Sequence, residues 1–472
     1  MPLSLPLTAF EQYMLLDGTA DHPMDFFFRL RFHGSLELDL DALQEALDAA
    51  VRRHPLLAAR IDSHRTTGPR FTISAGGPIR LQTAPPLSDP DAFPAFAAID
   101  PARGPLLRFV IVGTVTAATD PDTTNRFDMI AQFHHAACDG LGAVAFLNDF
   151  LKLLAARLTA LDPQLDPLNP LQLRGRGRYG LKLWSFVTSL HRQARGLEGV
   201  WKFLTNKPVR LESVGAAVAV ATAAESAESP AANTRCPTAC SFTLDSQTTA
   251  ALRQAARRNG VSVNELLTAA LFSTLRATIP ATAFDQHRSV IRLCMPMNAR
   301  QASDSRTPAA NIVSMIFLDR SPQQILDAPA LLQSIHDEIQ LIKRCGLKMT
   351  FIFTLWLARL LPGGIRSLVK NQQTAATALF TNLGSIFNCR QRAASQAMHV
   401  GRARLVSIEI LPPIRAGTGL GVAVCEYTHA LHCTLHSDPK VLSNKQTVVL
   451  CDLLRDCLLQ RAGVVDTLSA PY

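Results

Sequence analysis

The spacing of hydrophobic residues in the N-terminal half predicts buried strands that alternate with amphipathic helices. Residues 26–32 and 127–133 are short apolar runs rich in strand-forming side chains, so each predicts a strand. After the second run, residues 144–154 carry valine and leucine at helical spacing, which predicts a helix. The segment 134–140 is therefore expected to form a strand-to-helix turn, where a side chain can project into a cleft from a rigid backbone.

The pattern also predicts where several helices begin and end. Asp41 with Gln44 can cap a helix that ends at His54-Pro55. A helix over 246–258 is expected to close at Asn259-Gly260, and a last helix is expected near 445–460.

The C-terminal half mixes helices and strands in the same way as the N-terminal half. Strand-like runs are predicted at 289–297, 312–318, 405–411 and 421–427. No internal repeat of fixed period is present. Strands and helices in both halves predict α/β or α+β lobes.

Length and composition fit a multi-unit chain without a membrane span. The 472 residues exceed one ordinary hydrophobic core, so two or three units are expected. No run of about 18 uninterrupted apolar residues occurs, which argues against a spanning helix. The first residues lack a basic segment before an apolar run, so we expect no secretory signal and a cytoplasmic location.

Positive charge gathers in one segment of the chain. Residues 171–210 contain nine Lys or Arg and one acidic residue, Glu198, against a formal net charge of +9 for the chain. The same segment carries an apolar stripe at helical spacing, formed by Leu183, Val187, Leu190, Ala194, Leu197, Trp201 and Leu204. An alanine-, serine- and glutamate-rich segment, 214–232, follows and is expected to be a linker.

Three readings of this basic segment remain open. It can be a helix packed on a lobe with its basic face in water, or a helix that lies on a membrane surface through residues 181–205. It can also dock an acidic carrier protein or the phosphates of CoA. Nucleic acid is disfavoured as a partner, because no nucleic-acid-binding module is recognisable.

The candidate chemistry lies in the predicted turn, whose sequence is His134-His135-Ala136-Ala137-Cys138-Asp139-Gly140. A histidine such as His135 is the usual general base near neutral pH. Asp139 can pair with an arginine, and Gly140 permits a turn or a close approach. The structural alternative is a turn in which Asp139 only caps the next helix. A metal site is less expected, because adjacent histidines on a strand point to opposite faces.

Other chemistries lack their motifs. The sequence has no GxSxG, no GxxxxGK[ST] and no CxxC pair. Its one GxGxxG match, residues 175–180, follows a proline-containing loop rather than a clear strand, so we interpret it as chance. The ten cysteines are interpreted as reduced and mostly buried, with a metal site at Cys236 and Cys240 disfavoured. Cys138 is assigned to packing.

The turn resembles the HHxxxDG signature of the condensation-domain and chloramphenicol-acetyltransferase-like acyltransferase superfamily. Further stretches resemble elements of that superfamily in the same order, namely residues 7–16, 38–61, 244–271, 294–300, 311–320 and 381–384. The resemblance covers nearly the whole chain and suggests a standalone member. The DFGWG motif of the plant BAHD branch is absent, which puts membership of that branch in doubt.

This resemblance implies two chloramphenicol-acetyltransferase-like α/β (α+β) lobes, with His135 at the centre of a tunnel between them. We expect an N-terminal lobe over 1–170, a basic bridge and linker over 171–240, and a C-terminal lobe over 241–472. The implied activity moves an acyl group from a CoA or acyl-carrier-protein thioester to an alcohol or amine, without a covalent acyl-enzyme. No bound cofactor and no metal are expected, and a role in secondary metabolism fits the superfamily.

The resemblance also implies roles for the residues of the turn. His135 would take the proton of the acceptor, and His134 would support ring orientation or packing. Asp139 would be structural, with Arg300 as the first choice of partner and Arg292 as the second. Main-chain donors or Asn311 are candidates for stabilising the oxyanion.

Two alternatives to this function are kept. A non-catalytic relative would use the two-lobed shape to bind a carrier protein or another partner, although the intact His135, Asp139 and Gly140 argue against that. A second enzymatic alternative is a membrane-associated wax ester or glycerolipid synthase, peripheral to the membrane. An open channel that reaches His135 from both faces would favour catalysis over binding.

Overall fold

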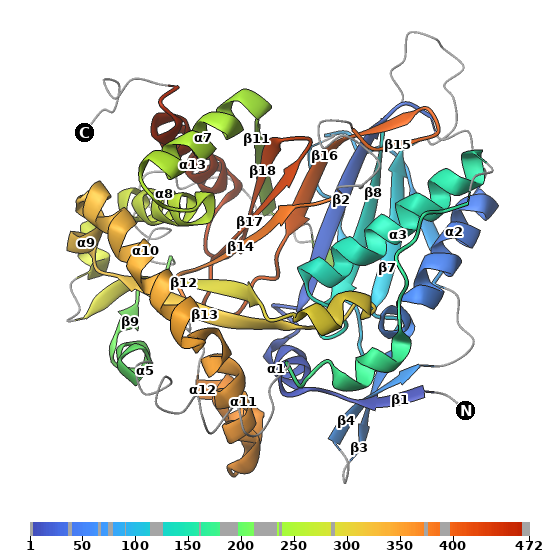
Figure 1. Cartoon of the computed structure of the whole chain (residues 1–472), viewed down its shortest axis with the longest axis horizontal. Helices are drawn as coiled ribbons and strands as arrows, with labels where there is room; N and C mark the ends of the chain where they lie inside the picture. Colours follow the sequence, from blue (N-terminus) through green and yellow to red (C-terminus); the bar gives the residue numbers. More distant parts are fainter. Residues whose placement is uncertain are drawn as a thin grey trace.

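The computed structural model describes most of the chain as two large mixed sheets, each packed against its own helices (Figure 1). The described residues are 3–35, 40–64, 68–73, 79–89, 91–113, 126–159, 162–179, 197–211, 234–235, 238–284, 288–371, 376–387 and 397–464. The mixed α/β class predicted from the hydrophobic pattern is confirmed.

The first large sheet has six strands in the order β15-β16-β2-β8-β7-β5. Their bounds are β15 His399–Val400, β16 Ala403–Leu411, β2 Asp25–His33, β8 Arg126–His134, β7 Leu107–Gly113 and β5 Leu81–Ala84. Helices α2 (Leu40–Arg53) and α3 (Gly140–Thr159) cover one face of this sheet (Figure 1). Alternate side chains of β2, including Phe28 and Phe32, are buried in the core that these helices close. Two strands of this sheet, β15 and β16, come from the C-terminal half of the chain.

The second large sheet has seven strands, with the main order β11-β18-β17-β14-β12-β13 and β9 paired to β12. The bounds are β11 Thr238–Leu244, β18 Ala430–Ser437, β17 Leu420–Tyr427, β14 Ala378–Ser385, β12 Ser289–Asn298, β13 Val313–Arg320 and β9 Lys207–Pro208. Among the described residues, five α-helices contribute to its core, α7 (Ser246–Arg258), α8 (Val263–Thr278), α9 (Pro322–Leu326), α10 (Ala328–Cys345) and α13 (Asn444–Ala462). Helix α7 ends at Arg258 and Asn259 is its C-cap, as its sequence predicts.

The remaining elements frame these two sheets. A three-stranded sheet joins β1 (Leu3–Pro6), β4 (Gly68–Ile73) and β3 (Arg60–His64), and β10 (Thr234–Arg235) pairs with β6 (Phe96–Ala97). Within the described residues, the other α-helices are α1 (Ala9–Asp17), α5 (Leu197–Thr205), α11 (Thr350–Leu360) and α12 (Gly364–Asn371). The 3₁₀ helices in the described parts of the chain are Pro55–Ala58, Pro170–Gly175, Ala281–Phe284, Ala302–Arg306 and Leu347–Met349.

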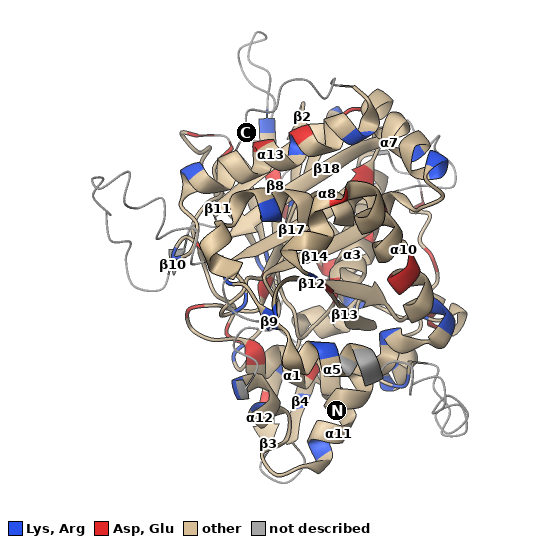
Figure 2. Cartoon of the chain, turned by 90° about the vertical axis from the view of Figure 1, so that its left-hand side faces the viewer, with Lys and Arg blue, Asp and Glu red and all other residues tan. Residues whose placement is uncertain are grey.

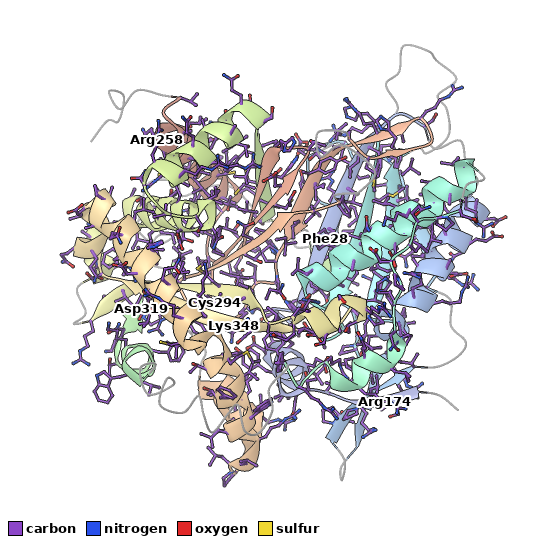
Figure 3. All side chains as sticks on the ribbon, viewed as in Figure 1. Phe28, Arg174, Arg258, Cys294, Asp319 and Lys348 are labelled. Atoms are coloured by element: carbon purple, nitrogen blue, oxygen red, sulfur yellow. The ribbon has the colours of Figure 1, made fainter. Side chains whose placement is uncertain are left out.

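A third hydrophobic core joins the parts of the chain that carry the two large sheets. It contains Phe10, Tyr13 and Met14 of α1, together with Cys294 of β12 and Met315 of β13. It also contains the buried face of α11. Figure 3 labels Cys294 on β12 of the second sheet, in the left half of the view. Helix α1 is therefore a wall of the space where the two halves meet.

The predicted cap of helix α2 is wrong. Asp41 lies inside the first turn, because α2 already begins at Leu40. The side chain of Gln44 donates to the Ile79 carbonyl at 2.9 Å and accepts from the Leu81 amide at 2.8 Å. Gln44 therefore holds the start of β5 against the helix, which is a tertiary role that the local sequence does not reveal.

The basic bridge is only partly described. Residues 180–196, which hold most of the predicted stripe, lie outside the described residues. Helix α5 covers the end of the stripe, where Trp201 is 65% and Leu204 is 71% exposed. The 175–180 glycine motif begins at the end of a 3₁₀ helix, and Gly180 lies outside the described residues.

Candidate active site

The histidine pair stands at the end of a central strand. His134 is the last residue of β8 and lies opposite Asp25 of β2. His134 is buried, and its Nδ1 accepts a hydrogen bond from the Ala136 amide at 3.2 Å. Burial, and secondly the neighbouring His135, lower the pKa of His134 to about 4. His134 is therefore neutral with its proton on Nε2, and its ring supports the turn.

His135 is fixed by its backbone on both sides. Its amide donates to the Met24 carbonyl at 2.7 Å, and its carbonyl accepts from Asn311 Nδ2 at 2.7 Å. Its ring packs beside Phe10 and Phe26, with ring centroids 6.4 Å and 5.1 Å away. The ring is thus held in place before any substrate arrives, which is the condition for an effective general base.

The charge state of His135 suits a base. Burial lowers the pKa of this imidazole below its ordinary 6.5, and its own carbonyl, Asp139 and Asn311 oppose that effect only partly. The Nδ1 atom is buried without a hydrogen-bond partner among the described residues. Nε2 is therefore the nitrogen left to meet a substrate.

His135 lines a small apolar cavity between the two halves of the molecule. The cavity has a volume of about 40 Å³, and its lining is Met14, Met24, His135, Cys294, Pro296, Met315, Ala376, Leu379, Pro413, Arg415 and Thr418. A second cavity of about 230 Å³ is lined by Asn264, Met295, Pro296, Phe380, Asn382 and Gly384. The two cavities share Pro296. The space at His135 holds about one water molecule, so an acyl group needs side chains to move apart.

Asp139 forms a bidentate ion pair with Arg300. Arg300 Nη1 lies 2.9 Å from Oδ2, and Nη2 lies 2.9 Å from Oδ1. The same carboxylate accepts from the Gly142 amide at 2.8 Å and from the Ile312 amide at 2.9 Å. Asp139 therefore caps α3 and also ties the turn to the loop before β13.

The other arginine considered from the sequence, Arg292, has a different partner. It bonds Asp319 at 2.6 Å and 2.7 Å, and its guanidinium lies 4.4 Å from the Phe203 ring centroid. Arg292 and Asp319 are cross-strand partners in the register of β12 and β13, so this ion pair links the two strands.

In this structure the Asn311 side chain hydrogen-bonds the backbone of the turn instead of pointing a donor at an oxyanion. Its Nδ2 donates to the carbonyls of His135 and Ala136, at 2.7 Å and 2.8 Å. Both amide hydrogens are thereby engaged, which overturns its candidacy as an oxyanion donor. A main-chain donor is left as the alternative.

Glycines allow the turn to approach its neighbours closely. A Cβ on Gly140 would lie 2.8 Å from Cδ2 of Leu383 on β14, so the start of α3 touches the second sheet at this point. A Cβ on Gly142 would lie 3.0 Å from Cys138 Cβ and 3.1 Å from the backbone of Ala310. The Gly142 contact is with backbone, which cannot swing aside.

We expect Gly142→Ala to destabilise the protein by about 1–3 kcal/mol, because the added methyl group overpacks the turn. Gly199→Ala in α5 is the matched control, since a Cβ there meets no atom within 4 Å. Chemical denaturation of both variants checks this. Equal stability of the two variants would show that the turn accommodates the added methyl group at position 142 without strain.

Sequence reasoning missed one charged residue of the cavity, Arg415. Its Nη2 donates to Asp17 Oδ1 at 2.8 Å, its Nε donates to Oδ2, and the guanidinium lies 5.4 Å from the Tyr13 ring centroid. Arg415 and Asp17 are 398 positions apart, so no local pattern could have paired them. A guanidinium held by α1 thus shares the cavity with the imidazole of His135.

No cluster of three or more histidine, cysteine, aspartate or glutamate residues that could hold a metal occurs among the described residues. Cys236, half of the close cysteine pair, lies outside them.

Two family models match parts of the chain. The wax ester synthase/diacylglycerol acyltransferase catalytic domain matches residues 123–267, which include the histidine turn. The phthiocerol/phthiodiolone dimycocerosyl transferase C-terminus matches residues 233–317, which include Arg300 and Asn311. The comparison with curated proteins gives no match.

Solved condensation domains share the fold over almost the whole chain. The first condensation domain of the calcium-dependent antibiotic synthetase, with a substrate analogue, is 14% identical with a TM-score of 0.65 and 98% coverage of both chains. The starter condensation domain of rhizomide synthetase, in complex with C8-CoA, is 13% identical with a TM-score of 0.63 and coverage of 99% and 98%. The epimerization domain from the third module of tyrocidine synthetase B is 15% identical with a TM-score of 0.57 and 98% coverage of both chains.

At this identity the structural matches establish the two-lobed fold, and the family models point to acyl transfer as the general activity. The two kinds of match together confirm the resemblance found in the sequence, to the condensation-domain and chloramphenicol-acetyltransferase-like acyltransferase superfamily.

Proposed function

We propose that this protein transfers an acyl group from a thioester to an alcohol or amine, with His135 as general base. The observation that carries the proposal is a neutral imidazole, clamped through its backbone to Met24 and Asn311, that lines an apolar cavity between the lobes. The apolar lining suits an acyl chain once its side chains move apart, and a fixed neutral imidazole suits the removal of one proton.

The proposed step is a direct transfer. His135 Nε2 takes the proton from the acceptor O–H or N–H as the acceptor atom attacks the thioester carbonyl carbon. The tetrahedral intermediate collapses, the C–S bond breaks, and the leaving thiolate takes the proton back from the imidazolium. No oxidant, metal or other co-reactant enters this balance.

The cysteines near the site support a mechanism without an acyl-enzyme. Burial raises the pKa of the Cys294 thiol, which lines the cavity, to about 12. Burial also raises the pKa of Cys138 well above its ordinary value. Both groups are therefore thiols near neutral pH, and a thiol is a poor nucleophile compared with a thiolate.

The donor is proposed to be an acyl-CoA or an acyl carrier protein. The related starter condensation domain holds C8-CoA in its solved structure, which supports CoA as one donor. The match to the wax ester synthase/diacylglycerol acyltransferase model favours an alcohol over an amine as the acceptor. A membrane-associated wax ester or glycerolipid synthase is accordingly the form of this activity that we place second.

Binding without catalysis is the other candidate function. The fold does not decide between them, because the solved structures that share it are only 13–15% identical to this chain. In a pure binding module, His135 would have no reason to be preorganised beside an apolar cavity.

The test is an incubation of the protein with acyl-CoAs of graded chain length and a pool of alcohols and amines, followed by mass spectrometry. The proposal expects free CoA and an acylated acceptor for at least one chain length. Saturable thioester binding with no product from any pair would favour the binding module.

The pH dependence of the reaction follows from the charge state of His135. Because the pKa of this imidazole lies below its ordinary 6.5, the neutral, basic form persists into mildly acidic solution. We expect the acid limb of the kcat/KM profile to have its midpoint below pH 6.5 and to disappear in His135→Ala. A midpoint above pH 6.5 would mean that another group controls the reaction.

A further inference from the structure

An apolar turn surrounded by cations projects from the molecule between α11 and α12 (Figure 1). At this turn Leu357 is 59%, Leu360 is 83% and Leu361 is 57% exposed. We call these three residues the leucine tip. Burying such side chains from water is favourable, so three neighbouring exposed leucines suggest that something covers them.

The stretch of sequence that contains the leucine tip carries charge of one sign. Residues 339–408 contain ten Lys or Arg and no Asp or Glu. Five of these cations are exposed on or beside the α11–α12 hairpin, namely Lys343, Arg344, Arg359, Arg366 and Lys370. Figure 2 shows basic segments on both α11 and α12. Arg366 and Lys370 form no ion pair within the part of the chain that the structure describes.

We propose that the leucine tip and its cations form a docking surface for a lipid bilayer that carries anionic headgroups. Leucines that protrude on a turn can enter the headgroup boundary while flanking Lys and Arg meet lipid phosphates and carboxylates. An acidic protein would satisfy the cations but would need a matching apolar pocket for Leu360. A second copy of the chain fits less well, since one turn supplies little of the 1,200–2,000 Å² or so that a stable interface buries.

This surface is different from the 181–205 bridge that the sequence suggested, but α5, the described part of that bridge, lies near helix α11. Phe203 of α5 packs on Phe317 of β13, with ring centroids 4.8 Å apart, and Phe317 packs on Phe351 of α11 at 6.1 Å. Both views place α5 and α11 at the same end of the molecule.

The proposed contact is peripheral. None of the described helices is by itself long and apolar enough to cross a membrane. The pair Leu347–Leu360 and Gly364–Lys370 reaches that length and composition only when taken together, and it is bent by 119°.

The buried side of the same hairpin leads to the proposed active site. Phe351 of α11 packs on Phe10 and Tyr13 of α1, with ring centroids 6.4 Å and 5.3 Å away. Phe10 in turn lies 6.4 Å from the His135 ring centroid. Helix α11 is also anchored by Arg359, whose Nη2 donates to the Leu7 carbonyl at 2.9 Å. A bilayer at the leucine tip would thus contact one end of α11, the helix whose other end packs on α1 beside His135, and could deliver a long-chain substrate to that side of the site. This last step rests on the proposed function, whereas lipid binding itself does not.

The test is co-sedimentation of the full-length protein with phosphatidylcholine vesicles, with and without phosphatidylserine, at low and high salt. We expect binding that needs phosphatidylserine and weakens with salt. Leu360→Ser with Leu361→Ser should weaken binding by about tenfold per leucine, the worth of one buried side chain. Arg366→Glu with Lys370→Glu should weaken it as well.

Two matched controls distinguish binding at this surface from nonspecific binding to vesicles. Leu326→Ser removes a leucine that is 73% exposed on α9. Arg258→Glu reverses a cation on α7, at the other end of the molecule from α11 in Figure 3. Both controls should bind vesicles as the unmodified protein does.

Three results would overturn the proposal. The first is that the unmodified protein sediments with neither kind of vesicle. The second is that the leucine-tip variant (Leu360→Ser with Leu361→Ser) binds vesicles as well as Leu326→Ser does. The third is that the unmodified protein binds no vesicles but forms a dimer, and the leucine-tip variant does not form that dimer. Turnover of a short-chain, water-soluble acyl-CoA is measured alongside and should not change in the leucine-tip variant. If the unmodified protein binds vesicles but turns over no acyl-CoA, the proposed function is wrong and the docking surface stands.

Discussion

Replacing His135 with alanine is expected to lower kcat/KM for acyl transfer by about two to four orders of magnitude, the usual contribution of a general base. Stability should change little, because the ring borders a cavity and its backbone anchors to Met24 and Asn311 do not involve the side chain. Steady-state kinetics on the best thioester and acceptor, with thermal unfolding of the same samples, measure both quantities.

The neighbouring histidine supplies the control for that experiment. His134 is buried, neutral and hydrogen-bonded through Nδ1 to the turn backbone. His134→Ala should therefore cost more stability than His135→Ala and less activity. An inactive His134→Ala beside a fully active His135→Ala would reverse the assigned roles.

Breaking the Asp139–Arg300 pair is expected to destabilise the protein by about 3–5 kcal/mol, because the remaining charge is left in a largely buried place. Asp139→Ala should cost more than Arg300→Ala, since Asp139 also accepts from the Gly142 and Ile312 amides. The double variant should be less destabilised than the sum of the two single variants. Denaturant unfolding of the three proteins gives the coupling free energy.

The exposed pair Asp100–Arg103 is a control of the same chemistry. Its side chains are 53% and 88% exposed, and the closest N–O distance is 3.4 Å. Such surface pairs contribute about 0–1 kcal/mol, so the Asp100 and Arg103 cycle should show little coupling. Full additivity in the Asp139 and Arg300 cycle would mean that the ion pair contributes nothing beyond its separate hydrogen bonds.

The strands around the site could be predicted because their side chains obey a strong local rule. Every second residue of β2 from Phe26 to Phe32 is buried under α2 and α3, so the apolar pattern follows directly from the packing. The turn after β8 could be located for the same reason, since a strand pattern gives way to a helix pattern within seven residues.

Relations between distant residues could be predicted only as alternatives. The sequence left Arg300 and Arg292 as partners for Asp139, and the register of the second sheet separates them. Arg292 lies inside β12 opposite Asp319, whereas Arg300 lies beyond the end of β12, where it reaches the turn. Strand register is a property of the assembled sheet, which a single sequence does not display.

Other features left no local trace. The Arg415–Asp17 pair joins the two ends of the chain, and Gln44 binds backbone groups of Ile79 and Leu81 instead of capping its own helix. The leucine tip was hidden as well, because residues 350–361 have the composition of a buried helix. Only the fold shows that Leu357, Leu360 and Leu361 are left outside the core.

The central claim, direct acyl transfer at His135, is tested most directly by one mass balance. The unmodified protein is incubated with one acyl-CoA, with and without its acceptor, and free CoA and acylated acceptor are quantified in the same sample. Direct transfer predicts one free thiol for each acylated acceptor, release of thiol only when acceptor is present, and loss of both products in His135→Ala. Thiol released without acylated acceptor, or equal product from His135→Ala, would contradict it.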